Sequence, residues 1–246
     1  MKYDQITDVK EVKNIIHHCF EHLRAEDQQR FVKKLHEQPN NFDQKMHILN
    51  ELILGAYLSL KDFEVRYEYS VKNKIPDWCI LYKESAVIGI VELVNFHRDK
   101  DTETEIDKQM QADSHAIFWS RENKNNNRLY QSIWNKIQKY GALVQELKIP
   151  YIIAICPDWR AGINFKRLLP CLHHNESGLF RMYPHVSGVL YFGGNLEEYS
   201  FRYEQNHNAL RKVDLPSGIL SFVKDNGLAA EARRISKWSL KETETL

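Results

Sequence analysis

The sequence predicts an α/β fold in which a mixed central β-sheet is flanked by helices and preceded by an N-terminal helical extension. Three observations lead to this prediction. The first forty residues place apolar side chains at helical spacing, and the segment Ala86–Phe96 is almost continuously apolar and β-branched. The expected elements also follow the order helix, three strands, helix, strand, helix. With 246 residues, the chain is long enough to bury a core without disulfides.

The N-terminal half is expected to contain three helices followed by three strands. Thr7 or Asp8 caps the first helix, and Asp43 caps the third, which is apolar nearly all round and therefore packs on more than one side. The first strand alternates apolar and polar residues, as a strand with one buried face does. The expected elements are helices ending at Leu23, over Glu26–His36 and over Gln44–Leu60, then strands over Asp62–Val71, Ile75–Tyr82 and Ala86–Phe96.

The C-terminal half begins with a polar segment, His97–Asn127, that is expected to be loop or frayed helix. The elements expected after it are a helix over Leu129–Leu147, a strand over Pro150–Cys156, a helix over Asn164–Leu172, strands over Val186–Phe192 and Tyr199–Tyr203, and a terminal helix bearing Trp238. These divide the chain into an N-terminal helical extension (1–40), an α/β core with C-terminal strands (41–225) and a helical tail (226–246). Ala86–Phe96 is expected in the interior of one sheet.

Net charge and hydropathy limit the classes of protein to which this chain can belong. Lys and Arg number 34 against 33 Asp and Glu, which gives a net charge of +1, so any contact with nucleic acid must be local. No apolar run approaches the roughly 18 residues that span a bilayer, and the N-terminus lacks a hydrophobic signal core. We therefore expect a soluble, cytoplasmic protein with no membrane partner. The four widely spaced cysteines are expected to be reduced thiols.

Two acids interrupt segments that should be apolar strands. Asp77 opens the segment IPDWCILY, and Glu92 lies inside AVIGIVELVNF. A carboxylate in a central strand needs a partner, hydrogen bonds or a metal ion. On adjacent antiparallel strands the two acids would converge on a hard cation such as Mg²⁺. The alternative is that Asp77 caps a turn after Pro76 and Glu92 lies on an exposed strand face.

A third acid, Glu51, is the only acidic side chain in the apolar helical segment Met46–Leu60. It belongs either to the same site or to a narrow polar strip that it forms with His47 and Asn50. The sequence leaves both interpretations open.

The order of these acids resembles the PD-(D/E)XK nuclease superfamily. That family has an acid in the first core helix, Pro-Asp opening a second strand, and a third strand bearing an acid, a spacer and a lysine. Glu51, Pro76-Asp77 and Glu92 stand at these places, and the resemblance covers residues 42–156. It implies a restriction-endonuclease-like core and a nuclease dependent on Mg²⁺ or Mn²⁺. Asp77 and Glu92 would then hold the metal, and Glu51 would bind a second metal or a metal-bound water.

The chain departs from the family at the lysine, because Val94 stands two residues after Glu92. Valine cannot position water or offset charge in the transition state. Lys136 is a candidate replacement, since it interrupts the apolar stripe of the helix over Leu129–Leu147. It either snorkels past the sheet edge or presents its ammonium to the acids, as in family members whose lysine has moved to this helix. The other candidates are Lys139, Lys72 and Lys74.

Three functions fit these observations. The first is a metal-dependent phosphodiesterase acting on nucleic acid, with Asp77, Glu92, Glu51 and Lys136 as its site. The second is a catalytically degenerate binding or assembly module with the same fold, which the absent lysine and the neutral net charge favour. The third is an interaction protein that self-associates through its terminal helices. Zinc at His17-His18-Cys19 or Cys171-x-His173-His174 is disfavoured, because neither cluster has the spaced pairs of a structural zinc site.

Overall fold

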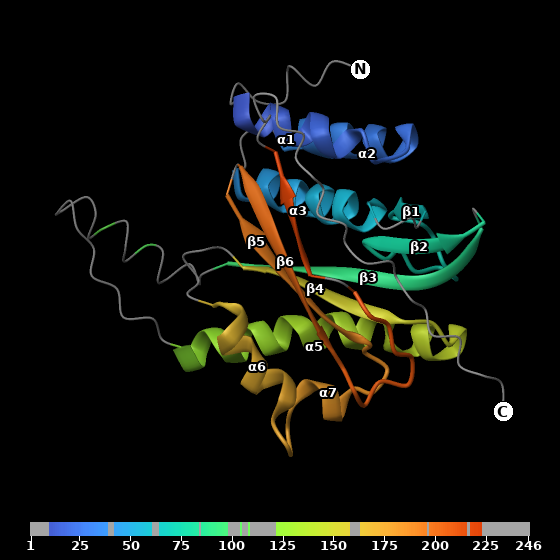
Figure 1. Ribbon diagram of the computed structural model, residues 1–246, viewed down its shortest axis with the longest axis vertical. Helices are drawn as coiled ribbons and strands as arrows, with labels where there is room; N and C mark the ends of the chain where they lie inside the picture. Colours follow the sequence, from blue (N-terminus) through green and yellow to red (C-terminus); the bar gives the residue numbers. More distant parts are fainter. Residues whose placement is uncertain are drawn as a thin grey trace.

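The computed structural model describes residues 10–38, 42–60, 64–83, 85–97, 104, 108, 122–157, 163–195, 197–215 and 217–222. Its strands form one seven-stranded sheet, in which β1 to β7 lie side by side in chain order (Figure 1). The strands are β1 Glu64–Tyr67, β2 Trp78–Tyr82, β3 Ala86–Phe96, β4 Tyr151–Pro157, β5 Gly188–Gly194, β6 Glu198–Gln205 and β7 Gly218–Ser221. The pairs β3–β4 and β4–β5 are parallel and the other pairs are antiparallel, so the sheet is mixed.

Helices cover both faces of this sheet (Figure 1). On one face α3 packs against the strands, and α1 and α2 lie over α3; α5, α6 and α7 cover the other face. The helices are α1 Lys10–Phe20, α2 Ala25–Glu37, α3 Phe42–Ser59, α5 Glu122–Leu147, α6 Phe165–His173 and α7 Leu179–Met182. In β3, Val91 and Leu93 face α3, whereas Ile90 and Val94 face α5. Because both faces are covered, β3 needs apolar residues on both sides.

The α/β class and the mixed sheet flanked by helices are confirmed, and β3 has the predicted bounds in the interior of the sheet. Two strand predictions were too long. β1 ends at Tyr67, because Glu68 has a φ of 47° and turns the chain out of the extended conformation. β2 begins at Trp78 rather than Ile75, after a tight turn in which Val71 and Lys74 exchange backbone hydrogen bonds.

Several helix predictions need correction. The first helix ends at Phe20 rather than Leu23, because the amides of His22 and Leu23 bond to carbonyls three residues back instead of four. The third helix begins at Phe42, so Asp43 lies inside its first turn instead of preceding it. α5 begins at Glu122, within the segment that was expected to be loop or frayed helix, because helical geometry tolerates the run of polar residues that precedes the apolar stripe. The four-residue elements α7 and β7 are too short to leave a periodic pattern and were not predicted.

Some predictions fall outside the described residues, namely the cap at Thr7 or Asp8 and the terminal helix bearing Trp238. In the part of the chain that the structure describes, no helix is both long enough and apolar enough to cross a membrane. The four cysteines are free thiols, and all except Cys171 are buried.

One glycine contact joins α3 to the start of β2. A Cβ atom on Gly55 would lie 1.9 Å from the ring of Trp78, which is fully buried. Alanine usually stabilises a helix relative to glycine by about 1 kcal/mol, but overpacking a core costs about 1–3 kcal/mol. We therefore expect Gly55→Ala to lower the free energy of unfolding, measured by denaturant titration. Gly141→Ala in α5 is the matched control, because its new Cβ would meet only the half-buried ring of His185. Equal stability of the two variants would contradict the prediction.

Candidate active site

The carboxylates of Asp77 and Glu92 meet the ammonium group of Lys136 where β2 begins beside β3. Lys136 Nζ lies 2.9 Å from Asp77 Oδ2 and 2.7 Å from Glu92 Oε2. The Glu92 side chain is fully buried, whereas those of Asp77 and Lys136 are 22% and 26% exposed. The structure therefore brings together three of the four predicted site residues and leaves two of them accessible to solvent.

Hydrogen bonds to the backbone fix the two carboxylates relative to each other. The amide of Asp77 donates to Glu92 Oε1 at 2.8 Å, and the amide of Leu93 donates to Asp77 Oδ2 at 2.7 Å. The residue before Asp77 is Pro76, which has a fixed φ and no amide hydrogen, so β2 starts only after it. The Asp77 side chain thus continues the pairing of β2 with β3 by one residue before the start of β2. Asp77 does follow Pro76 as a turn-forming acid would, but its carboxylate accepts hydrogen bonds from the Leu93 amide of β3 and from Lys136.

Two tyrosines hold Lys136 over the strands. The Tyr151 hydroxyl on β4 donates to the backbone carbonyl of Lys136 at 3.0 Å. One helical turn after Lys136, the buried Tyr140 hydroxyl donates to the carbonyl of Ile75 at 2.6 Å. These bonds tie α5 to β4 and to the segment just before Asp77. The expected approach of Lys136 to the acids is therefore present in the structure, and its catalytic role stays a prediction.

Val94, two residues after Glu92, is buried beneath α5 on the same face of β3 as Glu92. The side chain at position 94 therefore serves apolar packing, and the ammonium group that reaches Glu92 comes from Lys136 on α5. Asn95, the next residue, faces α3 and accepts a hydrogen bond from Asn50 at 2.9 Å.

Burial and neighbouring charges shift the pKa values of Glu92 and Lys136. Burial raises the pKa of Glu92 to about 8, and the charge of Asp77 raises that pKa in the same direction, whereas the Lys136 ammonium opposes both. Burial by itself lowers the pKa of Lys136, but the two carboxylates outweigh it and raise the pKa above its usual value. Lys136 therefore stays charged, and the Glu92 carboxylate takes up a proton at a higher pH than an ordinary carboxyl group does.

Glu51 lies on the opposite face of the sheet, in a second group of polar side chains. Its carboxylate accepts a hydrogen bond from the Tyr67 hydroxyl and lies 3.6 Å from Lys34 Nζ. Lys34 also donates to Tyr67 and, at 2.7 Å, to Glu68. Burial raises the pKa of Glu51, and the Lys34 ammonium counteracts that rise. Within the described residues, no hydrogen bond or ion pair joins Glu51 to Asp77, Glu92 or Lys136.

Asp77 connects the two groups. The Glu68 amide donates to the carbonyl of Asp77 at 3.1 Å, so the end of β1 and the start of β2 are bonded there. Burial lowers the pKa of Lys34, but the charges of Glu51 and Glu68 outweigh it and raise that pKa. The charge of Asp77 adds to the rise in the pKa of both Lys34 and Glu51. The two polar groups therefore lie next to each other where β1 ends and β2 begins. We call them together the polar row, which consists of Lys34, Glu51, Tyr67, Glu68, Asp77, Glu92 and Lys136. Neither Lys34 nor Tyr67 was identified from the sequence as part of it.

The other residues singled out from the sequence lie elsewhere. Lys139 is exposed and stacks over the ring of Tyr140. Lys72 pairs with Glu146, and Lys74 is an exposed residue of the turn before β2. The polar strip on α3 packs within the chain, since His47 contacts His97 and Asn50 contacts Asn95.

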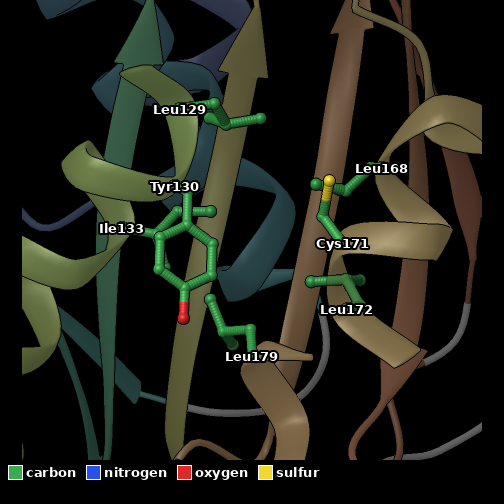
Figure 2. Close-up of a pocket in the computed structure, with 7 residues that line it drawn as sticks. All are labelled: Leu129, Tyr130, Ile133, Leu168, Cys171, Leu172 and Leu179. Carbon is green, nitrogen blue, oxygen red and sulfur yellow. The ribbon is translucent and has the colours of Figure 1, made fainter. Parts of the chain in front are cut away.

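A small apolar pocket between α5, α6 and α7 shares no residue with this row (Figure 2). It is lined by Leu129, Tyr130, Ile133, Leu168, Cys171, Leu172 and Leu179. The Tyr130 hydroxyl bonds to Met182 Sδ at 3.3 Å, and burial raises the pKa of the Cys171 thiol. The pocket carries no charged group and adds nothing to the chemistry of the acids.

Within the described ranges, no group of three or more His, Cys, Asp or Glu side chains is arranged to hold a metal ion. Comparison of the chain with protein-family models, curated proteins and solved structures found no match.

Proposed function

We propose that this protein is a phosphodiesterase that depends on Mg²⁺ or Mn²⁺ and cleaves nucleic acid. The observation that carries the proposal is the meeting of the Asp77 and Glu92 carboxylates with the Lys136 ammonium at a place that solvent reaches. The order of the acids along the chain, with Glu51 ahead of Pro76-Asp77 and Glu92, resembles PD-(D/E)XK nucleases and supports the same function. A restriction-endonuclease-like core is part of this proposal.

The donor set fits a hard divalent cation. Mg²⁺ and Mn²⁺ prefer oxygen ligands, and a carboxylate pair supplies them while leaving coordination positions for water and phosphate. Lys136 pairs with the carboxylates of Asp77 and Glu92, and Lys34 pairs separately with those of Glu51 and Glu68. When all are ionised, one negative charge remains without a cationic partner in each of these two groups. A divalent ion at Asp77 and Glu92 would offset the excess in the first group.

Each residue then has a distinct task. Asp77 and Glu92 hold the metal ion, which when bound activates water and offsets charge on phosphate. Lys136 contributes its ammonium to the phosphoryl oxygens, whose negative charge grows in the transition state. Tyr140 and Tyr151 keep α5 in register with Asp77. Because the pKa of Glu92 is about 8, the proton on its carboxylate competes with the metal, so activity should increase as the pH rises toward 8.

One observation favours a second candidate, a binding or assembly module without catalysis. The Lys136 ammonium already bonds one oxygen of each carboxylate, so the acids have a partner without any metal. In that case the three residues form a structural ion pair between α5 and the sheet.

Cleavage assays separate the two candidates. Single- and double-stranded DNA and RNA would each be incubated with wild-type protein and Mg²⁺ or Mn²⁺, with Asp77→Asn as the inactive variant and EDTA as the metal-free control. We expect metal-dependent cleavage of at least one substrate and a loss of about 100-fold or more in Asp77→Asn, because a ligand to the metal is removed. Identical background for both proteins on all four substrates would reject the nuclease and leave the binding module.

A further inference from the structure

We infer that the Lys34 ammonium occupies the position of a second cation beside Glu51, so that the site takes one divalent ion and not two. Lys34 belongs to α2, in the N-terminal helical segment that the sequence separates from the core. The N-terminal helical segment then contributes Lys34 to the site. The catalytic role of the single remaining ion rests on the proposed function. The position of Lys34 does not, because it follows from contacts within the chain.

The contacts place Lys34 where a metal ion beside Glu51 would bind. Its Nζ lies 2.7 Å from Glu68 Oε1 and 3.6 Å from Glu51 Oε2, and it donates to the Tyr67 hydroxyl. Tyr67 in turn donates to Glu51, so the Glu51 carboxylate is engaged by a hydroxyl and an ammonium at once. Two carboxylate oxygens thus face one cationic group, which is the donor set that a hard cation would use.

Packing keeps Lys34 in this position. Its ammonium lies 4.8 Å from the centre of the Tyr67 ring, and the aromatic ring of Phe31, one turn earlier in α2, stacks on Tyr67 at 4.1 Å between centroids. Arg30 of the same helix donates to the backbone carbonyls of Tyr67 and Glu68. The Lys34 side chain is only 33% exposed, so the ammonium is held by several groups rather than extended into water.

This arrangement changes the role of Glu51 from the one the sequence suggested. With Lys34 in place, Glu51 has no need of a second metal ion, and its carboxylate helps to hold the lysine beside Tyr67 and Glu68. The site then has a fixed positive charge on each face of the sheet, Lys136 on the α5 side and Lys34 on the α3 side. Lys136 also bonds two carboxylates, so a divalent ion at Asp77 and Glu92 would have to displace its ammonium from them. Lys34 is held in addition by the hydroxyl and the ring of Tyr67.

The test counts metal ions. Mn²⁺ would be titrated into the full-length protein by calorimetry at pH 8.5, and the stoichiometry compared between wild type and Lys34→Met. We expect one ion in wild type and two in Lys34→Met, because removal of the ammonium leaves Glu51 and Glu68 free to bind Mn²⁺. The added ion should be absent from Lys34→Arg, which keeps the charge, and from the double variant Lys34→Met with Glu51→Gln. Lys33→Met is the matched control, since Lys33 is the neighbouring, well-exposed lysine of α2.

The outcomes separate this inference from the proposed function. No ion in wild type but one in Lys34→Met, dependent on Glu51, supports the inference and rejects the metal-dependent enzyme. One ion in both proteins overturns the inference and leaves the enzyme standing. Two ions in wild type, or none in either protein, also overturn the inference.

Glu51→Gln gives a second measurement that does not depend on Lys34→Met folding. If Lys34 takes the place of the second ion, Glu51→Gln should bind one Mn²⁺ with an affinity within about threefold of wild type. If Glu51 is itself a metal ligand, the affinity should fall by tenfold or more, and that fall would overturn the inference.

Discussion

Lys136→Met should lower the rate of metal-dependent cleavage by roughly two orders of magnitude or more, the scale of loss when one charge-stabilising group leaves a preorganised site. The variant should also bind Mn²⁺ more tightly than wild type, because the ammonium no longer competes for Asp77 and Glu92. Methionine suits a helix and the apolar stripe around position 136, so the fold should be kept. Single-turnover cleavage, Mn²⁺ calorimetry and circular dichroism of the same preparation test the three expectations.

Lys139→Met is the control for this change, since Lys139 lies one turn further along α5 and is exposed. It should cleave and bind Mn²⁺ like wild type. If Lys136→Met cleaves as fast as wild type, the metal site stands but Lys136 has no part in the reaction. If Lys136→Met is destabilised and Mn²⁺ binding is unchanged, the lysine is a structural partner of the acids.

Glu92→Gln should flatten the pH dependence of stability between pH 5 and pH 8. The folded-state pKa of Glu92 is raised from 4.5 to about 8, so the folded protein keeps this proton while the unfolded chain loses it. That difference stabilises the fold fully below pH 4.5 and is lost as the pH rises toward 8. At about 1.4 kcal/mol per pKa unit, the rise from 4.5 to about 8 corresponds to a loss on the order of 5 kcal/mol in wild type. Glutamine cannot ionise, and the variant should therefore be the more stable protein at pH 8.

Urea titrations at pH 5.5, 6.5, 7.5 and 8.5 measure this difference without added metal. Glu146→Gln is the control, because Glu146 is an exposed acid that pairs with Lys72. Its stability should follow wild type at each pH. Parallel curves for wild type and Glu92→Gln would mean that Glu92 is ionised throughout, held so by Lys136, and that its proton does not compete with the metal.

The central strand and the lysine on α5 were predictable from the sequence for the same physical reason. Ala86–Phe96 is apolar on both faces, and only a covered strand tolerates that composition. Lys136 interrupts the apolar stripe of α5, where a charge needs a partner. In each case the feature can be recognised from the order of apolar and charged residues within one segment.

Lys34 could not be found in this way. It follows Lys33 on an amphipathic helix with many polar residues, and nothing in the spacing distinguishes the two. Its partners come from β1 and α3 and are brought to it only by tertiary packing. The end of β1 was missed for a related reason, since Glu68 leaves the extended conformation at the point where its side chain meets Lys34. Contacts between distant segments determine these features, and periodicity does not record them.

The most direct measurement is a crystal structure of the protein with Mn²⁺, in which anomalous scattering locates the ion. A metal-dependent site at this place predicts one ion with oxygen atoms of Asp77 and Glu92 about 2.0–2.6 Å away, and Lys136 moved off the line between the two carboxylates. Lys34 should still contact Glu51 and Glu68. An ion bound elsewhere, or Lys136 still bonded to both acids in crystals saturated with Mn²⁺, would contradict the assignment of these residues as a metal-dependent active site.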